Sequence, residues 1–267
     1  MWIPVIVVAG LGIVFASFLT YFFVKFHVEE NPLVSKIYQL LPHANCGACG
    51  FAGCSGFAEA LSKGEVSPEK CAMISSENLK KICSLLGIEG GEKEKKVARV
   101  FCFGGINAKR RIEYNTIKSC SAIKAFFTTN SECAYGCIGF GDCIEVCPVS
   151  AIKMGEKGIP EIDENICVGC GKCVNACPQN IIHLVPFDKK VYIACSSHDK
   201  GSKVIKICKS GCIGCGKCVK VCPKGAIKLE NNLAVIDYDK CDNCEKCVSE
   251  CPRKIIFVSE RKVEMVA

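Results

Sequence analysis

Four stretches of the sequence crowd cysteines together and end in a proline. The most complete, Cys212–Pro223, is CIGCGKCVKVCP, and the other three, CIGFGDCIEVCP, CVGCGKCVNACP and CDNCEKCVSECP, begin at Cys137, Cys167 and Cys241. Thiolates at i, i+3 and i+6 can hold three corners of a [4Fe-4S] cluster from one loop, and the cysteine before proline ligates the neighbouring cluster. These stretches therefore predict one-electron chemistry on iron–sulfur clusters.

Three clusters receive complete ligand sets from this cross-over rule. Each run of three cysteines is grouped with the Cys-Pro cysteine of its partner run. The predicted sets are Cys147, Cys167, Cys170 and Cys173 (cluster 3); Cys212, Cys215, Cys218 and Cys251 (cluster 4); and Cys222, Cys241, Cys244 and Cys247 (cluster 5).

The remaining run lacks its second cysteine, because Phe140 stands at that position. Aligning CAYGCIGFGDC, which begins at Cys133, with CKSGCIGCGKC, which begins at Cys208, suggests that Cys133 replaces the missing ligand. The predicted set for cluster 2 is therefore Cys133, Cys137, Cys143 and Cys177. The alternative is that Cys102 or Cys120 completes this site instead.

Enough cysteines remain outside the runs to ligate one more cluster. The segment RVFC, ending at Cys102, is similar to YIAC, ending at Cys195. The set left over, a candidate sixth cluster, is Cys102, Cys120, Cys195 and Cys208. Cys83 is then unassigned, and we expect it to be an ordinary buried residue of a helix.

A separate cysteine module precedes the runs, within NCGACGFAGCSGFAEALSKGEVSPEKC. Small residues around its first three cysteines would let the backbone wrap around a cluster. A structural zinc site is the alternative, since four cysteines also suit zinc. The predicted ligands of cluster 1 are Cys46, Cys49, Cys54 and Cys71.

The N-terminal segment Trp2–Val24 contains no charged residue. At about 1.5 Å per helical residue it is long enough to cross a hydrocarbon core of roughly 30 Å. A signal peptide would begin with basic residues and end at a small-residue cleavage site, whereas this segment ends in aromatic residues and Lys25. We expect a single-pass anchor in the inner (cytoplasmic) membrane, with the Fe-S domains on the cytoplasmic side because Lys25 and Lys36 follow it.

Composition excludes several classes of protein. The chain has 267 residues and 25 cysteines, an odd number that sits too densely for a disulfide scaffold. Its formal net charge is +7, but five or six oxidised clusters on thiolates subtract about 10 to 12 charges, so nucleic-acid binding is not indicated. No dinucleotide fingerprint or catalytic constellation occurs, and we expect no catalytic residue, flavin or nucleotide on this chain.

Each Cys-Pro is followed by a short apolar run, which predicts the helix, turn and strand of half a bacterial ferredoxin. The expected fold class is α+β: a transmembrane helix, a small four-cysteine Fe-S domain and tandem bacterial-ferredoxin-like modules with two [4Fe-4S] clusters each. The expected boundaries are 1–27 for the anchor, 28–88 for the four-cysteine domain, 89–97 for a linker, 98–186 for the first ferredoxin-like unit and 187–267 for the second.

With its anchor, the motif LPHANCGACGFAGCSGFAEAL resembles that of the B subunit of the Rnf complex, a membrane-bound, ion-translocating ferredoxin:NAD oxidoreductase. The additional segments RVFCFGG, KSCSA and IACSSHDKG resemble the longer form found in anaerobes. The resemblance implies an electron-transfer subunit that accepts electrons from reduced ferredoxin. It also implies partner subunits, in the membrane and binding NAD, that complete the enzyme while Na⁺ or H⁺ is moved.

Three other classes share some of these features. A membrane-tethered polyferredoxin serving a hydrogenase or formate dehydrogenase would use the same repeats, but it would normally lack the Cys46–Cys71 module. An Fe-S redox sensor would need an output domain, and no segment of the sequence has that character. A structural zinc protein would be distinguished by iron analysis.

Overall fold

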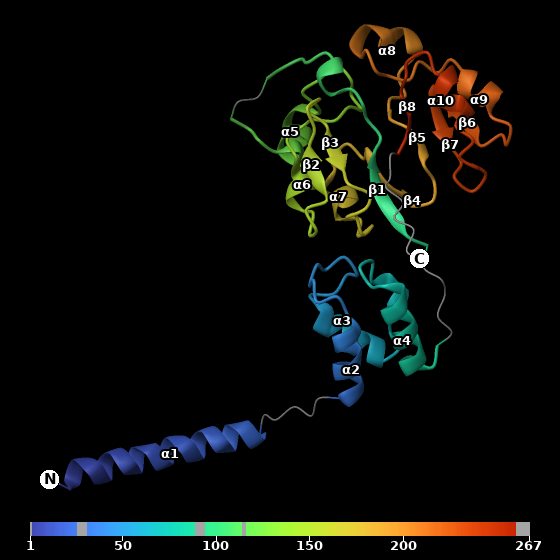
Figure 1. Cartoon of the computed structure of the whole chain (residues 1–267). Helices are drawn as coiled ribbons and strands as arrows, with labels where there is room; N and C mark the ends of the chain where they lie inside the picture. The colour runs from blue at the N-terminus through green and yellow to red at the C-terminus, as the bar shows by residue number, and fades with distance from the viewer. Residues whose placement is uncertain (1, 26–30, 89–93, 114–115, 260–267) are drawn as a thin grey trace.

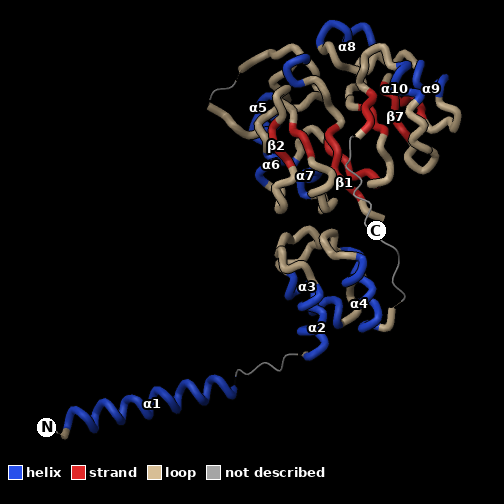
Figure 2. Tube along the Cα trace, viewed as in Figure 1, coloured by secondary structure: helices blue, strands red, loops and turns tan. Residues whose placement is uncertain are grey.

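The structure is a computed structural model, and it describes residues 2–25, 31–88, 94–113 and 116–259. Three parts follow one another along the chain (Figure 1): a long helix, a small helical domain and a larger part that contains the strands. Figure 2 shows that the strands occur only in the last part, as short pairs among loops. The α+β fold expected from the sequence is confirmed. The expected linker, 89–97, lies partly outside the described residues, and the first strand already begins at Lys96.

Helix α1, Ile3–Lys25, contains the span that could cross a membrane, Val5–Lys25. None of that span is buried against the rest of the described chain. Large apolar side chains such as Phe15, Leu19 and Phe23 are therefore exposed. Because exposing so much contiguous apolar surface to water is unfavourable, a lipid environment suits this helix best.

The helical domain consists of α2 (Pro32–Leu40), α3 (Cys54–Ser62), α4 (Ser76–Leu86) and a short 3₁₀ helix, Pro68–Lys70. Their apolar faces meet in a small core around Phe57 and Ile82. Helix α4 begins where Ser75 accepts a hydrogen bond from the backbone N–H of Asn78, and ends at Gly87, whose φ is positive. Cys83 is buried in this core, as predicted.

The two ferredoxin-like units have the same topology, in which an outer pair joins the first and last strands and a hairpin lies between them. In the first unit β1 (Lys96–Val100) pairs with β4 (Ile182–Pro186), and β2 (Ile152–Met154) with β3 (Pro160–Ile162), all antiparallel. In the second, β5 (Val191–Ile193) pairs with β8 (Ile256–Val258), and β6 (Ile227–Glu230) with β7 (Leu233–Ile236).

The short helices of these units lie before or within the cysteine runs. They are α5 (Cys120–Phe127), α6 (Asp142–Glu145), α7 (Lys172–Ala176), α8 (Gly201–Ile207), α9 (Lys217–Val221) and α10 (Lys246–Glu250). The apolar runs after each Cys-Pro form β2, β4, β6 and β8, as the sequence predicted. The cores consist largely of the strand residues and of the cysteines themselves. Tyr238 packs against both cores and so joins the two units.

Candidate iron–sulfur centres

The run cysteines are arranged by the same local geometry in each unit. The residue before each short helix has a left-handed backbone, and it is glycine in three runs, Gly141, Gly171 and Gly216. In the fourth run Glu245 adopts the same conformation, with φ of 60°. The third cysteine then lies on the helix and is buried, at Cys143, Cys173, Cys218 and Cys247. Each loop therefore turns the thiol of its third cysteine inward.

The structure brings together the cysteines expected at clusters 3 and 4. Burial, with the charges of Cys167, Cys170 and Cys147 beside it, raises the pKa of Cys173 to about 12. Burial likewise raises the pKa of Cys218 to about 11, with Cys212, Cys215 and Cys251 as charged neighbours. The four cysteines of cluster 4 also line one hollow of about 360 Å³.

Of the cysteines expected at cluster 5, the structure brings Cys241, Cys244 and Cys247 near one another and places Cys222 on the same apolar core as Cys241 and Cys247. Burial raises the pKa of Cys247 to about 11, and Cys241 and Cys244 are among its charged neighbours. Cys222, Cys241 and Cys247 belong to one apolar core. Because thiols must lose their protons to ligate a metal, binding of a cluster at these buried thiols would release protons.

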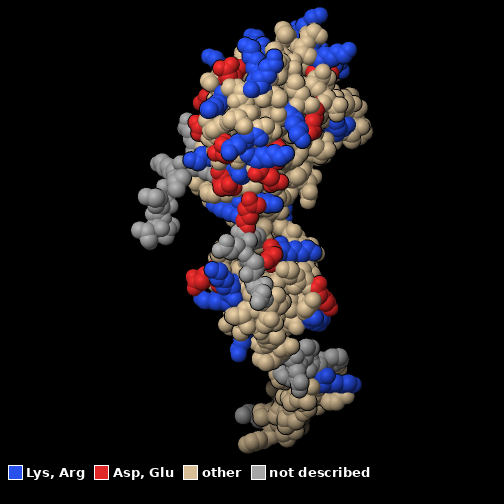
Figure 3. All heavy atoms as spheres, turned by 90° about the vertical axis from the view of Figure 1, so that its right-hand side faces the viewer, with Lys and Arg blue, Asp and Glu red and all other residues tan. Residues whose placement is uncertain are grey.

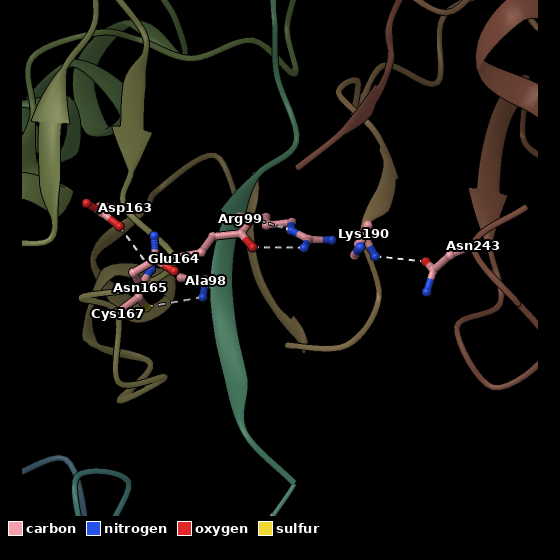
Figure 4. A network of polar contacts seen from close by, with 8 residues as sticks. All are labelled: Ala98, Arg99, Asp163, Glu164, Asn165, Cys167, Lys190 and Asn243. Carbon is pink, nitrogen blue, oxygen red and sulfur yellow. Dashed lines mark hydrogen bonds and ion pairs between the residues drawn. The ribbon is translucent and has the colours of Figure 1, made fainter. Parts of the chain in front are cut away.

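Backbone N–H groups donate hydrogen bonds to several cysteine sulfurs. The amide of Ala151 donates to Cys147 Sγ and that of Ala226 to Cys222 Sγ, both at 3.3 Å. From β1, the amide of Ala98 donates to Cys167 Sγ at 3.4 Å, next to the ion pair between Arg99 and Glu164 (Figure 4). Such hydrogen bonds are one of the factors that set a cluster's reduction potential.

The module of cluster 1 lies on the loop before α3. Asn45, with φ of 45°, accepts a hydrogen bond from the amide of Cys54 through Oδ1 at 2.8 Å, which fixes the start of the helix. Cys49, Cys54 and Cys71 pack on the same core of the helical domain. Cys46 lies close enough to Cys170 of the first ferredoxin-like unit for its charge to affect the pKa of that thiol.

The site around Cys137 has a composition different from the expected one. Its hollow, of about 340 Å³, is lined by Cys120, Cys137, Cys143 and Cys177. The backbone N–H of Phe140 donates a hydrogen bond to Cys120 Sγ at 3.3 Å. The structure thus brings Cys120, rather than Cys133, to the position left empty by Phe140.

Cys133 lies instead in a hollow between the two units. That hollow, of about 510 Å³, is lined by Cys102, Cys133, Cys195 and Cys208, and also by Cys137 of the neighbouring site. Burial raises the pKa of Cys133, and Cys102 and Cys208 are its charged neighbours. The set expected for the sixth cluster is therefore assembled except for Cys120, whose place Cys133 takes.

Sequence reasoning missed one residue of this region, Asp142. Its Oδ1 accepts a hydrogen bond from the amide of Cys120 at 2.7 Å, and its Oδ2 accepts from the amide and hydroxyl of Ser121 and the hydroxyl of Ser119. Burial alone would raise the pKa of Asp142, but these hydrogen bonds outweigh it and lower the pKa to about 2. The signal was visible: Asp142 stands where the other three runs have Lys172, Lys217 and Lys246.

The donor sets suit iron–sulfur clusters. Each set consists of cysteines around a hollow or a core. Gly104 also lines the hollow between the units. A Cβ at residue 104 would lie 3.6 Å from both Cys102 Sγ and Cys208 Sγ. Within the part of the chain that the structure describes, no three ligating side chains converge closely enough for a single metal ion. The fold and these thiol sets define a multi-cluster iron–sulfur electron carrier.

Comparison with known proteins agrees with this class. The FeS family, which describes an Fe-S cluster, matches residues 41–73. The 4Fe-4S dicluster domain family matches residues 136–181, 166–226 and 211–255.

Similar proteins of known type are subunits of one kind of complex. The chain is 44% identical, over 88% of its length and 84% of the relative, to the B subunit of the proton-translocating ferredoxin:NAD(+) oxidoreductase complex of Clostridium ljungdahlii. It is 40% identical, over 88% of its length and 89% of the relative, to the B subunit of the ion-translocating oxidoreductase complex of Methanosarcina acetivorans. It is 39% identical, over 90% of its length and 72% of the relative, to the B subunit of the Na(+)-translocating ferredoxin:NAD(+) oxidoreductase complex of Acetobacterium woodii. The chain belongs to the family of Rnf complex B subunits, and it relays electrons through iron–sulfur clusters.

Proposed function

We propose that this chain accepts electrons from reduced ferredoxin and passes them through its [4Fe-4S] clusters to other subunits of an Rnf complex. The complex would carry NAD reduction and Na⁺ or H⁺ translocation, while this chain contributes no complete active site. Single-electron transfer is what thiolate-bound clusters supply. The names of the similar proteins, which contain ferredoxin and NAD, support this donor and this acceptor.

The order of the thiol sets supports a directed relay. Cys46 neighbours Cys170, so the first set is close to the third. Cys143 neighbours Cys173, and Cys218 neighbours Cys247, which are links between the two sites within each ferredoxin-like unit. We use the word site, with the number of its cluster, for the cysteines expected to hold that cluster. Sites 4 and 5 then lie at one end of the relay. Site 1, which is next to the membrane helix in sequence, lies at the other end.

Electrons would arrive at the second unit. Cys215 of site 4 and Cys244 of site 5 are the exposed cysteines among the described residues, which leaves these sites nearest to an external donor. Lysine and arginine outnumber aspartate and glutamate in residues 189–259, and several groups of basic side chains lie at the end of the molecule remote from α1 in the view of Figure 3. This distribution would favour an acidic electron carrier as the donor.

The sidedness of the membrane also belongs to the proposal. With α1 as a single-pass anchor and Lys25 and Lys36 on its C-terminal side, the Fe-S domains would face the cytoplasm at the inner membrane. Other Rnf subunits, in the membrane and binding NAD, would then meet the chain near site 1.

The test is anaerobic reduction of the full chain by reduced ferredoxin, followed by electron paramagnetic resonance. Fast reduction that slows at high salt would support the donor, because exposed charges are screened over a Debye length of about 8 Å at physiological ionic strength. Clusters that dithionite reduces but ferredoxin does not would overturn the proposed donor while leaving the relay intact.

A further inference from the structure

We propose that a sixth [4Fe-4S] cluster joins the two ferredoxin-like units, held by Cys102, Cys133, Cys195 and Cys208, and that Cys120 completes site 2. The ligand sets do not depend on which donor reduces the chain. Only the path of electrons through the sixth site rests on the proposed function.

The first step of the argument is the equivalence of site 2 to a complete ferredoxin site. The hollow of site 4 is lined by Cys212, Cys215, Cys218 and Cys251, with Pro252 and Ile256 behind them. The hollow of site 2 is lined by Cys120, Cys137, Cys143 and Cys177, with Pro178 and Ile182 behind them. Of the six positions named, five correspond residue for residue, and at the sixth Cys120 takes the role of Cys215.

The second step is the way the chain holds Cys120 in that position. The Phe140 amide donates to its sulfur, and Asp142 accepts from its own amide, so both residues that distinguish this run contact Cys120. Asp142 also caps the start of α5 through Ser121. Residues 140–142 are Phe-Gly-Asp, where the runs from Cys167 and Cys212 have Cys-Gly-Lys. This difference removes one ligand and supplies the hydrogen bonds that hold Cys120 in its place.

The third step is the matched contribution of the two units to the hollow between them. In the first unit the amide of Cys137 donates a hydrogen bond to Cys102 Sγ at 3.4 Å. In the second unit the amide of Cys212 donates to Cys195 Sγ at 3.3 Å. Each unit thus places one extra cysteine beside the first cysteine of its run, and the two copies face the same hollow.

Backbone contacts hold the other two ligands across the same boundary. The amide of Lys109 donates to the carbonyl of Ile207 at 2.8 Å, and that of Lys209 to the carbonyl of Asn107 at 2.9 Å. Cys133 and Cys208 pack in one small apolar core with Ile207. The hollow is therefore built by both units and is not a gap left between independent modules.

The last step is the position of this site in the relay. Cys137 of site 2 lies next to Cys102, and Cys212 of site 4 lies next to Cys195, because the amide of each run cysteine donates a hydrogen bond to that sulfur. The sixth site accordingly lies between sites 2 and 4 and links the two pairs into one series, 5–4–6–2–3–1. Each hop along this series oxidises one cluster and reduces the next by one electron, with reduced ferredoxin as the reductant and no bond to a substrate formed or broken.

The experiment compares single variants of the full chain by iron and sulfide content and by electron paramagnetic resonance after dithionite reduction. We expect about 24 iron atoms in the wild type, as six cubanes require. Cys195→Ser and Cys133→Ser should lose or alter the same signal, and Cys120→Ser a different one. Cys83→Ala, at a buried cysteine outside every site, is the matched control and should keep all signals.

The assignment would be overturned if Cys120→Ser and Cys195→Ser lost the same signal and Cys133→Ser lost a different one. About 20 iron atoms in the wild type, unchanged by Cys195→Ser, would overturn the sixth site itself. Gly104→Val provides a test that keeps every thiol, because its side chain would fill the space between Cys102 and Cys208. It should lose the same signal as Cys195→Ser, and an unaltered signal would contradict the proposal.

The path has its own readout. In Cys195→Ser, stopped-flow reduction by ferredoxin should stay fast at sites 4 and 5 and become at least ~10-fold slower at sites 1, 2 and 3. Equal slowing at all sites would point to damaged donor binding, which concerns the proposed function. Unchanged rates at all sites would rule out passage through the sixth site.

Discussion

At the scale of single residues, Asp142 links the altered run to its replacement ligand. Asp142→Lys restores the residue type of the other runs, but it removes the acceptor for the amide of Cys120. We expect site 2 to lose iron several-fold faster to a chelator, while the other sites keep their rates. Asp142→Asn is the matched control, since asparagine retains one side-chain oxygen and caps helices well. Equal iron release from both variants would show that Asp142 does not position Cys120.

The ion pair between Arg99 and Glu164 is the second residue-scale feature, because it is almost completely buried. Arg99 Nε lies 2.7 Å from Glu164 Oε1, and the side chains are 3% and 10% exposed. The guanidinium also lies 5.2 Å from the centre of the Tyr192 ring, in the second unit. Arg99, on β1 of the first unit, therefore contacts both its own unit and the second unit.

Arg99→Met should lower stability strongly, since removing one partner of a buried pair costs about 3–5 kcal/mol. The expected result is a lower urea midpoint for the loss of visible cluster absorption. The double variant Arg99→Met with Glu164→Leu should recover much of this loss, because no unpaired charge then remains buried. A single variant as stable as the wild type would mean that water reaches the pair.

At the scale of elements, Gly169 shows how closely a cysteine loop approaches its strand. Its φ is +67°, and a Cβ there would clash with the carbonyl oxygen of Lys96 on β1. Gly169→Ala should therefore combine backbone strain of about 1–2 kcal/mol with an overpacking cost of about 1–3 kcal/mol. Thermal loss of cluster absorption is the measurement.

The control for this prediction is Gly64→Ala, which has a similar φ of +72° but no atom within 4 Å of the added Cβ. It should show the strain alone, and so a smaller shift. Equal shifts in the two variants would mean that the loop around Gly169 moves away from β1 without cost.

The elements also show what the sequence could and could not predict. The grouping of three cysteines in each of the predicted ligand sets 3, 4 and 5 follows from local spacing, because one loop determines the positions of its own three cysteines. The strands after each Cys-Pro follow from local spacing as well. The partner of Cys137 does not follow from spacing. Cys120 and Cys133 both precede the run, and which of them reaches the site depends on hydrogen bonds to Phe140 and Asp142. The pairing of β1 with β4 likewise joins segments on opposite sides of two cysteine runs.

At the scale of the whole molecule, the location of apolar burial predicts what happens when iron is removed. The helical domain has a core of its own, around Phe57 and Leu79. The ferredoxin-like units have two-stranded sheets and cores in which cysteines are major members. Because each unit is small and its aliphatic core residues pack around the cysteines, ligation should supply most of the folding free energy of the units.

Anaerobic removal of iron with a chelator should therefore unfold residues 97–259 while leaving much of α2 and α4 folded. Hydrogen exchange separates the two parts: amides of β1, β4, β6 and β7 should lose protection, and those of α4 should keep it. Circular dichroism should lose the strand contribution at the same time. Protected β1 and β4 amides in the iron-free chain would contradict this, and would mean that contacts such as the buried Arg99–Glu164 pair hold the units together without their clusters.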